Sequence, residues 1–150
     1  MNFSYPAKLS PDPEDGGFVV SFRDLPEAIT QGDTPEACVQ EAEGALEAAL
    51  EYRIGAGLEI PMPSPAVADE CMVSVPVHTA LKAALYLALR EMKVSKSELA
   101  RRLDLNEKEA RRILDPHHPT KTPTLERALH ALGKKISVQV WSGDEVSSTC

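Results

Sequence analysis

The chain has 150 residues, of which 43% are hydrophobic, and a formal net charge of −7. This length and composition allow one ordinary domain or two small ones, each with a real core. No stretch approaches the roughly 18 apolar residues of a membrane span, and the N-terminus lacks the charged-then-apolar pattern of a signal peptide. We therefore expect a cytoplasmic chain with no membrane partner.

The cysteines support the same expectation. Cys38, Cys71 and Cys150 are odd in number and far apart in the chain. Their spacing suits neither a disulfide framework nor a zinc site with four ligands. We expect reduced thiols, as is usual in the cytoplasm.

The charge is divided unevenly between the two halves of the chain. Residues 1–70 contain three basic and fourteen acidic side chains, a formal charge of −11, whereas residues 71–150 contain thirteen basic and nine acidic ones, a formal charge of +4. A basic half suits phosphate, and an acidic half suits a basic protein. The two halves are therefore expected to bind partners of opposite charge.

Two strands are predicted near the N-terminus. Residues 3–9 form the first, and residues 18–22 (FVVSF), which are β-branched and aromatic, form the second. Residues 10–17 are rich in Pro, Asp and Gly and are typical of a loop. The pattern predicts a hairpin that ends at Asp24-Leu25-Pro26.

A long acidic helix is predicted from Pro35 to about Ile54. Thr34 supplies the cap, proline at the first helical position is a start signal, and Gly55 or Gly57 stops the helix. One face is narrow and apolar, as suits a helix lying on a sheet. The other side carries a stripe at helical spacing, formed by Glu36, Gln40, Glu43, Glu47 and Glu51.

This acidic stripe has two interpretations. Like charges four residues apart cost a few tenths of a kcal/mol each in an isolated helix. The stripe is either a solvated face of an acidic protein or a docking face for a cationic partner, on which binding relieves the repulsion.

A proline-rich connector separates the halves. Residues 60–65 (IPMPSP) cannot continue a helix because proline lacks the N–H donor, so they are expected to be stiff and extended. A short strand over residues 71–77 follows and could rejoin the N-terminal sheet. We expect domains at residues 1–77 and 78–141, with residues 142–150 as a tail.

Residues 95–115 (SKSELARRLDLNEKEARRILD) predict a helix, a tight turn and a second helix. Ser95 and Glu98 form an S-x-x-E capping signature, and Asn106 and Glu109 repeat the pattern. Asp104 stands where the turn needs a left-handed residue, which Asp tolerates better than most. The apolar spacing of both helices allows them to pack together, which predicts a helix-turn-helix.

A helix-turn-helix with a basic second helix is the usual way to place side chains in a DNA major groove. Residues at the start of the second helix face base edges, and residues in flanking turns contact phosphates. For Arg101 and Arg102 we favour a solvated helix face. The predicted DNA contacts are Lys96, Asn106, Glu107, Lys108, Arg111, Arg112, Thr120, Lys121 and Thr122.

Two elements are predicted after the helix-turn-helix. A helix begins at Thr122-Pro123 and is closed by Gly133. Residues 135–141 (KISVQVW) alternate well enough to form a strand. A lone strand leaves unpaired backbone groups, so we expect it to pair with its twin across a two-fold axis, with pairing onto its own domain as the alternative.

At this point the chain resembles the HicB antitoxins. The resemblance is carried by Tyr5-Pro6, by residues 16–22 (GGFVVSF), by residues 24–28 (DLPEA) and by residues 30–34 (TQGDT) before an acidic helix. The helix-turn-helix behind a short third strand is similar to one branch of that family. The likeness covers residues 3–55 and about 78–141.

The resemblance implies an α+β protein with a partial ribonuclease-H-like N-terminal fold that has no nuclease activity. It implies that this half masks HicA, a small basic toxin that cleaves messenger RNA. It further implies that the C-terminal half binds double-stranded operator DNA as a homodimer or tetramer and represses the operon. No cofactor or metal is implied.

Two other functions remain open from the sequence. The chain could be a helix-turn-helix transcription regulator whose N-terminal half binds a partner other than a toxin, or only oligomerises. It could also be a nuclease that uses Asp24 and the helix glutamates to hold metal, but one strand carboxylate beside an exposed stripe is a poor set of convergent ligands. We therefore expect a protein that is not an enzyme.

Overall fold

The computed structural model describes residues 1–142. Within that range the chain forms two compact units. The first comprises Met1–Leu50, Pro61–Pro76 and residues from 139 onward, and the second comprises Glu51–Ile60 and Val77–Val138. The division after Pro76 lies one residue from the expected domain end, but the segment Glu51–Ile60, expected in the first domain, belongs to the second unit.

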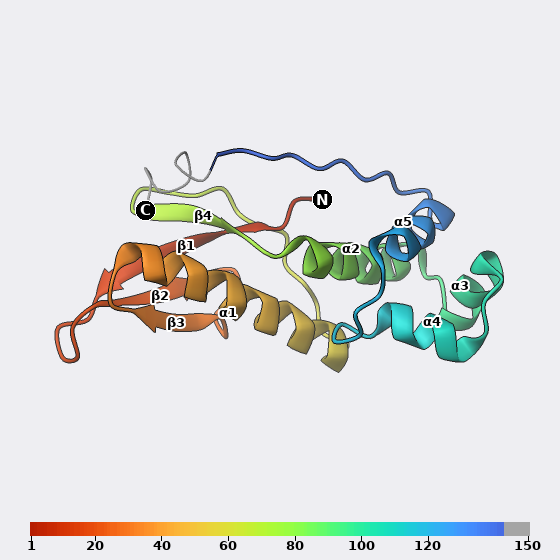
Figure 1. The fold of residues 1–150 in the computed structure, drawn as a ribbon, viewed down its shortest axis with the longest axis horizontal. Coiled ribbons are helices and arrows are strands. Elements are labelled where there is room, and N and C mark those ends of the chain that lie inside the picture. Colours follow the sequence, from red (N-terminus) through yellow and green to blue (C-terminus); the bar gives the residue numbers. More distant parts are fainter. Residues whose placement is uncertain (143–150) are drawn as a thin grey trace. The chain divides into compact units, whose positions relative to one another are not determined.

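The first unit contains a four-stranded antiparallel sheet in the order β3-β2-β1-β4 (Figure 1). Its strands are β1 (Ser4–Pro11), β2 (Phe18–Phe22), β3 (Ile29–Gly32) and β4 (Glu70–Ser74). The predicted hairpin is confirmed, with Leu9 opposite Val20. The strand after the connector rejoins the sheet, with Ala7 opposite Cys71, so the connector is a crossover.

Helix α1 (Pro35–Ala56) lies along one face of this sheet (Figure 1). Its predicted apolar stripe is buried, and Leu46 and Leu50 are fully enclosed with Tyr5 and Phe22 from the strands. A Cβ atom added at Gly32 would lie 2.9 Å from Cys38 Sγ, so only glycine lets the helix start this close to β3.

The second unit contains four helices among the described residues. They are α2 (Val77–Met92), α3 (Lys96–Leu103), α4 (Glu107–Leu114) and α5 (Thr122–Ala131). Leucines from α2, α3 and α5 and Ile113 of α4 share one core. Leu99 and Leu125 are completely buried, so these short helices are stabilised by packing rather than by propensity alone.

The α+β class is confirmed, but several local expectations differ from the structure. β3 and α2 were not among the predicted elements. The strand expected at residues 135–141 is not formed within the chain: residues 134–142 have no regular secondary structure, and pairing onto its own domain is not observed. Backbone groups of such a segment need a partner strand to form a ladder, which one chain does not supply here.

The cysteine expectation is only partly correct. Cys38 is buried and free, and burial raises the pKa of its thiol. Cys71 is disulfide-bonded, which contradicts the expected reduced thiol. Cys150 and the rest of the expected tail after Ser142 lie outside the described residues. No helix in residues 1–142 is both long and apolar enough to cross a membrane.

Candidate functional site

Local capping defines helices α3 and α4 and the turn between them. The Ser95 side chain accepts a hydrogen bond from the Glu98 N–H, and Asp104 adopts the left-handed conformation (φ 55°, ψ 45°) that ends α3. Asn106 and Glu109 form a complete capping box at the start of α4. These contacts satisfy N–H groups that a helix start leaves without partners, and they hold the turn that joins α3 to α4.

The exposed side of α4 carries most of the predicted DNA contacts. Its first turn presents Asn106, Glu107 and Lys108, and the following turn presents Arg111 and Arg112, all exposed. Glu107 Oε1 accepts a hydrogen bond from the Ser97 hydroxyl of α3 at 3.4 Å. The opposite side of α4 is closed by Ala110 and Ile113, which are buried.

The flanking residues divide into two groups. Lys96 at the start of α3, and Lys121 and Thr122 at the start of α5, are exposed. Thr120 is buried, and its hydroxyl donates to the Arg112 carbonyl at 3.2 Å. Thr120 therefore supports the loop after α4, and its side chain is not positioned for the phosphate contact that we predicted.

The basic pair on α3 is engaged mainly by Glu98 of the same helix. Arg101 and Arg102 both pair with the carboxylate of Glu98, at 3.0 Å from each Nε. These hydrogen bonds, the Arg102 one above all, hold the pKa of Glu98 below its ordinary value. Glu98 therefore does not complete the capping box of α3, and the two arginines are partly neutralised.

The acidic stripe of α1 follows the helix as predicted. Glu36, Gln40 and Glu43 are exposed, and Glu47 and Glu51 are half-buried. Neither Glu36 nor Glu43 has an ion-pair partner among the described residues. Glu36, Gln40 and Glu43 lie in the first unit, where the two exposed carboxylates of Glu36 and Glu43 form an anionic surface.

Glu51 is set apart from the rest of the stripe. It belongs to the second unit, where its Oε2 lies 3.3 Å from His117 Nδ1. The neighbouring His118 Nδ1 contacts the Thr120 hydroxyl at 3.1 Å. The His117 side chain therefore contacts helix α1, and the His118 side chain contacts its own loop.

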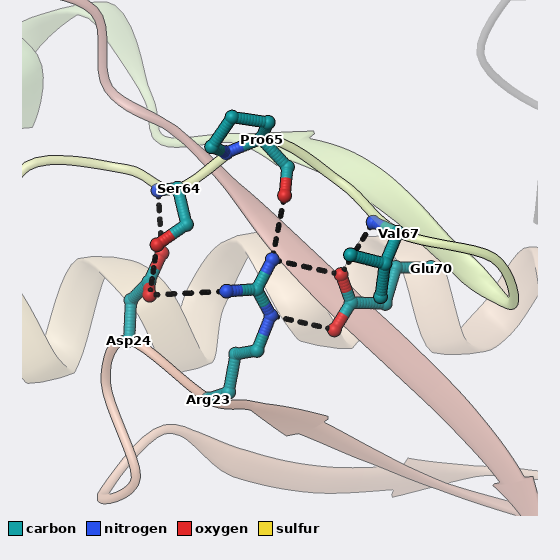
Figure 2. A network of polar contacts seen from close by, with 6 residues as sticks. All are labelled: Arg23, Asp24, Ser64, Pro65, Val67 and Glu70. Atoms are coloured by element: carbon teal, nitrogen blue, oxygen red, sulfur yellow. Dashed lines mark hydrogen bonds and ion pairs between the residues drawn. The ribbon is translucent and has the colours of Figure 1, made fainter.

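A polar network in the first unit was not predicted from the sequence (Figure 2). Arg23 Nε donates to Glu70 Oε1 at 2.8 Å, and its Nη2 donates to the Pro65 carbonyl at 2.6 Å. The Asp24 carboxylate accepts from both the backbone N–H and the hydroxyl of Ser64, at 2.8 Å each. The network fastens the connector to the sheet.

The ion pair within this network shifts the pKa of both of its partners. The hydrogen bond between Arg23 and Glu70 holds the pKa of the Glu70 carboxyl below its usual value and raises the pKa of the guanidinium. The Val67 N–H also donates to Glu70 Oε2, at 3.0 Å. Asp24, considered above as a metal ligand, is instead engaged by Ser64.

The comparisons with known proteins identify the chain's family. Residues 4–84 match the family described as HicB_like antitoxin of bacterial toxin-antitoxin system. The chain belongs to this HicB-like family. The match spans the whole sheet, α1, the connector and the start of α2.

Curated relatives extend the similarity beyond residue 84 to most of the chain. Antitoxin HicB of Escherichia coli (strain K12) is 38% identical over 134 residues, which cover 89% of this chain and 96% of the relative. Antitoxin HicB 1 of Photorhabdus laumondii is 37% identical over 139 residues, 93% of this chain and 88% of the relative. Antitoxin HicB of Pseudomonas fluorescens is 33% identical over 139 residues. The HicB-like chain is therefore an antitoxin of a toxin–antitoxin system, and such a protein implies a toxin partner.

Proposed function

We propose that this antitoxin acts in the cytoplasm by binding and neutralising a HicA-type toxin that cleaves messenger RNA, and by repressing its own operon through operator DNA. It acts by binding and not by catalysis. Membership in the HicB-like antitoxin family is the observation that carries the proposal. The two charged surfaces suggest how the two binding activities are divided.

The stripe of α1 is the proposed toxin-binding surface, with Glu36, Gln40, Glu43, Glu47 and Glu51 as its residues. A ribonuclease toxin must attract RNA phosphates, so its surface is expected to be basic. The open carboxylates of Glu36 and Glu43 are complementary to such a surface. Their mutual repulsion along the helix would be relieved when a cationic partner binds.

The toxin-binding proposal is tested by RNA cleavage. The small protein encoded beside this gene is assayed with and without the chain at equal concentration, and the chain should abolish cleavage. Glu43→Lys should weaken this inhibition at least about tenfold, since reversing a charge at an interface replaces attraction by repulsion. Unchanged cleavage in the presence of the natural chain would leave the alternative, a DNA-binding regulator with another partner.

Glu41→Lys is the matched control for Glu43→Lys. Glu41 is also exposed and on α1, but at about 100° per residue it lies roughly 160° around the helix from Glu43. The two variants have the same net charge and the same helix propensity. Equal loss of inhibition by both would contradict a docking face along the stripe and favour a general effect of net charge.

The exposed side of α4 is the proposed DNA-reading surface. Asn106 suits adenine, Lys108 and Arg111 suit guanine, and Glu107 suits cytosine. Arg112 joins these residues on α4. Lys96, Lys121 and Thr122 flank the helix at positions suited to phosphates.

We further propose that residues 135–141 join copies of the chain into a dimer or tetramer, which binds operator DNA. Val138, Val140 and Trp141 are 66%, 91% and 49% exposed. An apolar, alternating segment without a ladder partner is suited to pairing with the same segment of a second copy. Two recognition helices would then reach successive major grooves.

Gel-shift titration with DNA from upstream of the gene tests this second activity. Arg111→Ala should weaken binding to that DNA by about 5- to 150-fold and relax the base preference at one position of each half-site. Arg101→Ala removes the same charge from α3, where Glu98 already pairs with it, and should have a smaller effect. Equal effects would contradict base reading by α4.

A further inference from the structure

Lys82 is a buried cation that takes no part in the contacts described above. It lies on α2 and is only 3% exposed. Its Nζ donates to the carbonyls of Ile113 and Asp115 at 2.8 Å each, and to the carbonyl of Arg112 at 3.2 Å. The hydroxyl of Thr120 completes the set at 2.8 Å.

These acceptors are the C-terminal end of α4. The last four carbonyls of a helix have no partner within the helix and carry the negative end of its dipole. Here the Arg111 carbonyl is satisfied by the Asp115 N–H. The Arg112 and Ile113 carbonyls are satisfied by Lys82, so a charge from another helix performs part of the capping.

Lys82 also organises the loop that leads from α4 to α5. The Thr120 hydroxyl that accepts from Lys82 donates in turn to the Arg112 carbonyl at 3.2 Å. The Thr120 carbonyl contacts His78 Nε2 of α2 at 3.1 Å. The start of α5, with Lys121 and Thr122, is therefore held by the same cluster.

We propose that Lys82 is a positioning residue for DNA recognition, which fixes the orientation of α4 and of the α4–α5 loop on the core of the second unit. This inference rests on the proposed operator binding. A buried ammonium is costly to desolvate, and the charge is retained where three main-chain carbonyls must converge on one point. A methyl group in the same place would leave the Ile113 carbonyl without a donor, and the Arg112 and Asp115 carbonyls would keep only the Thr120 hydroxyl and the His118 N–H.

Positioning by Lys82 should affect the specificity for operator DNA more than the general affinity for DNA. Phosphate attraction depends on charge and tolerates small shifts of the helix, whereas base contacts need the side chains in register with the groove. Loss of the Lys82 contacts should therefore lower binding to operator DNA and spare binding to unrelated DNA. The groups facing Lys82 are Asp115, Thr120 and, through Thr120, His78 and His118.

Lys82→Met tests this inference, because methionine keeps the length of the side chain and removes the donor. We expect at least about a tenfold loss of affinity for operator DNA, with affinity for scrambled DNA changed less than threefold. Toxin inhibition should be unchanged. Amide hydrogen exchange in the DNA-free chain should become faster at Asp115, whose N–H donates to the Arg111 carbonyl of α4, and at His118 and Thr120, whose N–H groups are bonded within this loop.

Two further variants keep the test decisive. Thr120→Val leaves Lys82 in place and removes its side-chain acceptor, so it should cause the same changes to a smaller degree and is the readout if Lys82→Met does not fold. Leu132→Ala shortens a core side chain beyond the end of α5 and serves as the destabilised control. It should not alter the ratio of operator to scrambled binding.

The outcomes separate this inference from the proposed function. If the natural chain binds operator DNA and Lys82→Met and Thr120→Val keep its specificity, the positioning role is overturned. Exchange that rises no more than in Leu132→Ala would also overturn it. If the natural chain does not bind operator DNA, the DNA half of the proposed function fails, and the DNA role of Lys82 fails with it whatever the exchange data show.

Discussion

The cap at the start of α4 permits a test that separates stability from the proposed DNA contact. Asn106 Oδ1 accepts from the Glu109 N–H at 2.9 Å, and Glu109 Oε2 accepts from the Asn106 N–H at 3.1 Å. Asn106→Ala removes the first of these bonds and leaves the second without its reciprocal partner. The expected cost is about 1 kcal/mol of stability, within a range of roughly 0.5–2.

Ser95→Ala is the matched perturbation. Ser95 caps α3 by accepting from the Glu98 N–H at 3.1 Å, so its removal should also cost about 1 kcal/mol. Each variant should lower the melting temperature of the second unit by about 4–8 °C. Thermal unfolding followed by circular dichroism would measure both shifts.

DNA binding should distinguish the two variants. If Asn106 reads adenine at the start of α4, Asn106→Ala should lose about 1–3 kcal/mol of binding, or roughly 5- to 150-fold in affinity. Ser95→Ala should bind operator DNA nearly as the natural chain does at a temperature where both are folded. Equal weakening by the two caps would refute direct reading by Asn106, because stability alone would then explain the loss.

Three other substitutions test the stability of the fold. Burial lowers the pKa of Lys82 from the ordinary 10.5 to about 8, so between these pH values the unfolded chain binds more protons than the folded chain. The free energy of unfolding of the natural chain should therefore rise with pH in this range relative to that of Lys82→Met, by at most about 3 kcal/mol. A difference between the two proteins that stays constant with pH in denaturant titrations would contradict this. Glu70, whose pKa is held low mainly by Arg23, stabilises the fold when it is ionised. The natural chain should therefore be more stable than Glu70→Gln above about pH 4.5, and this difference in stability should vanish as acid protonates the folded carboxylate. Urea unfolding midpoints at pH 3 and 7 would measure it, and an equal difference in midpoint at both would count against the ion pair. Gly17→Ala should lower the melting temperature, since Gly17 has φ +73° and its added Cβ would lie 2.6 Å from the Gly32 carbonyl oxygen; an unchanged melting temperature would show that the β1–β2 loop relaxes freely.

The sequence by itself determined the features that depend on neighbouring residues. The caps at Ser95 and Asn106, the left-handed turn at Asp104 and the start of α1 at Pro35 are short-range interactions whose partners lie within a few residues. The periodic stripes of α1 were also readable, because one helix repeats every 3.6 residues. These local signals were sufficient to predict the α+β class and the two short helices on either side of Asp104.

Only the tertiary structure decided which distant residues meet. Arg23 and Glu70 are 47 positions apart, and Lys82 lies 31 positions from Ile113, so no spacing rule connects them. Thr120 has the sequence context of a polar loop residue, but it is buried where its hydroxyl meets Lys82 and the Arg112 carbonyl. β3 has little apolar pattern of its own and exists because β2 offers it a ladder, whereas residues 135–141 have the pattern but find no ladder among residues 1–142. Strand pairing and charge burial depend on what the rest of the chain brings alongside, and that is settled by the packing of the whole chain and not by local sequence.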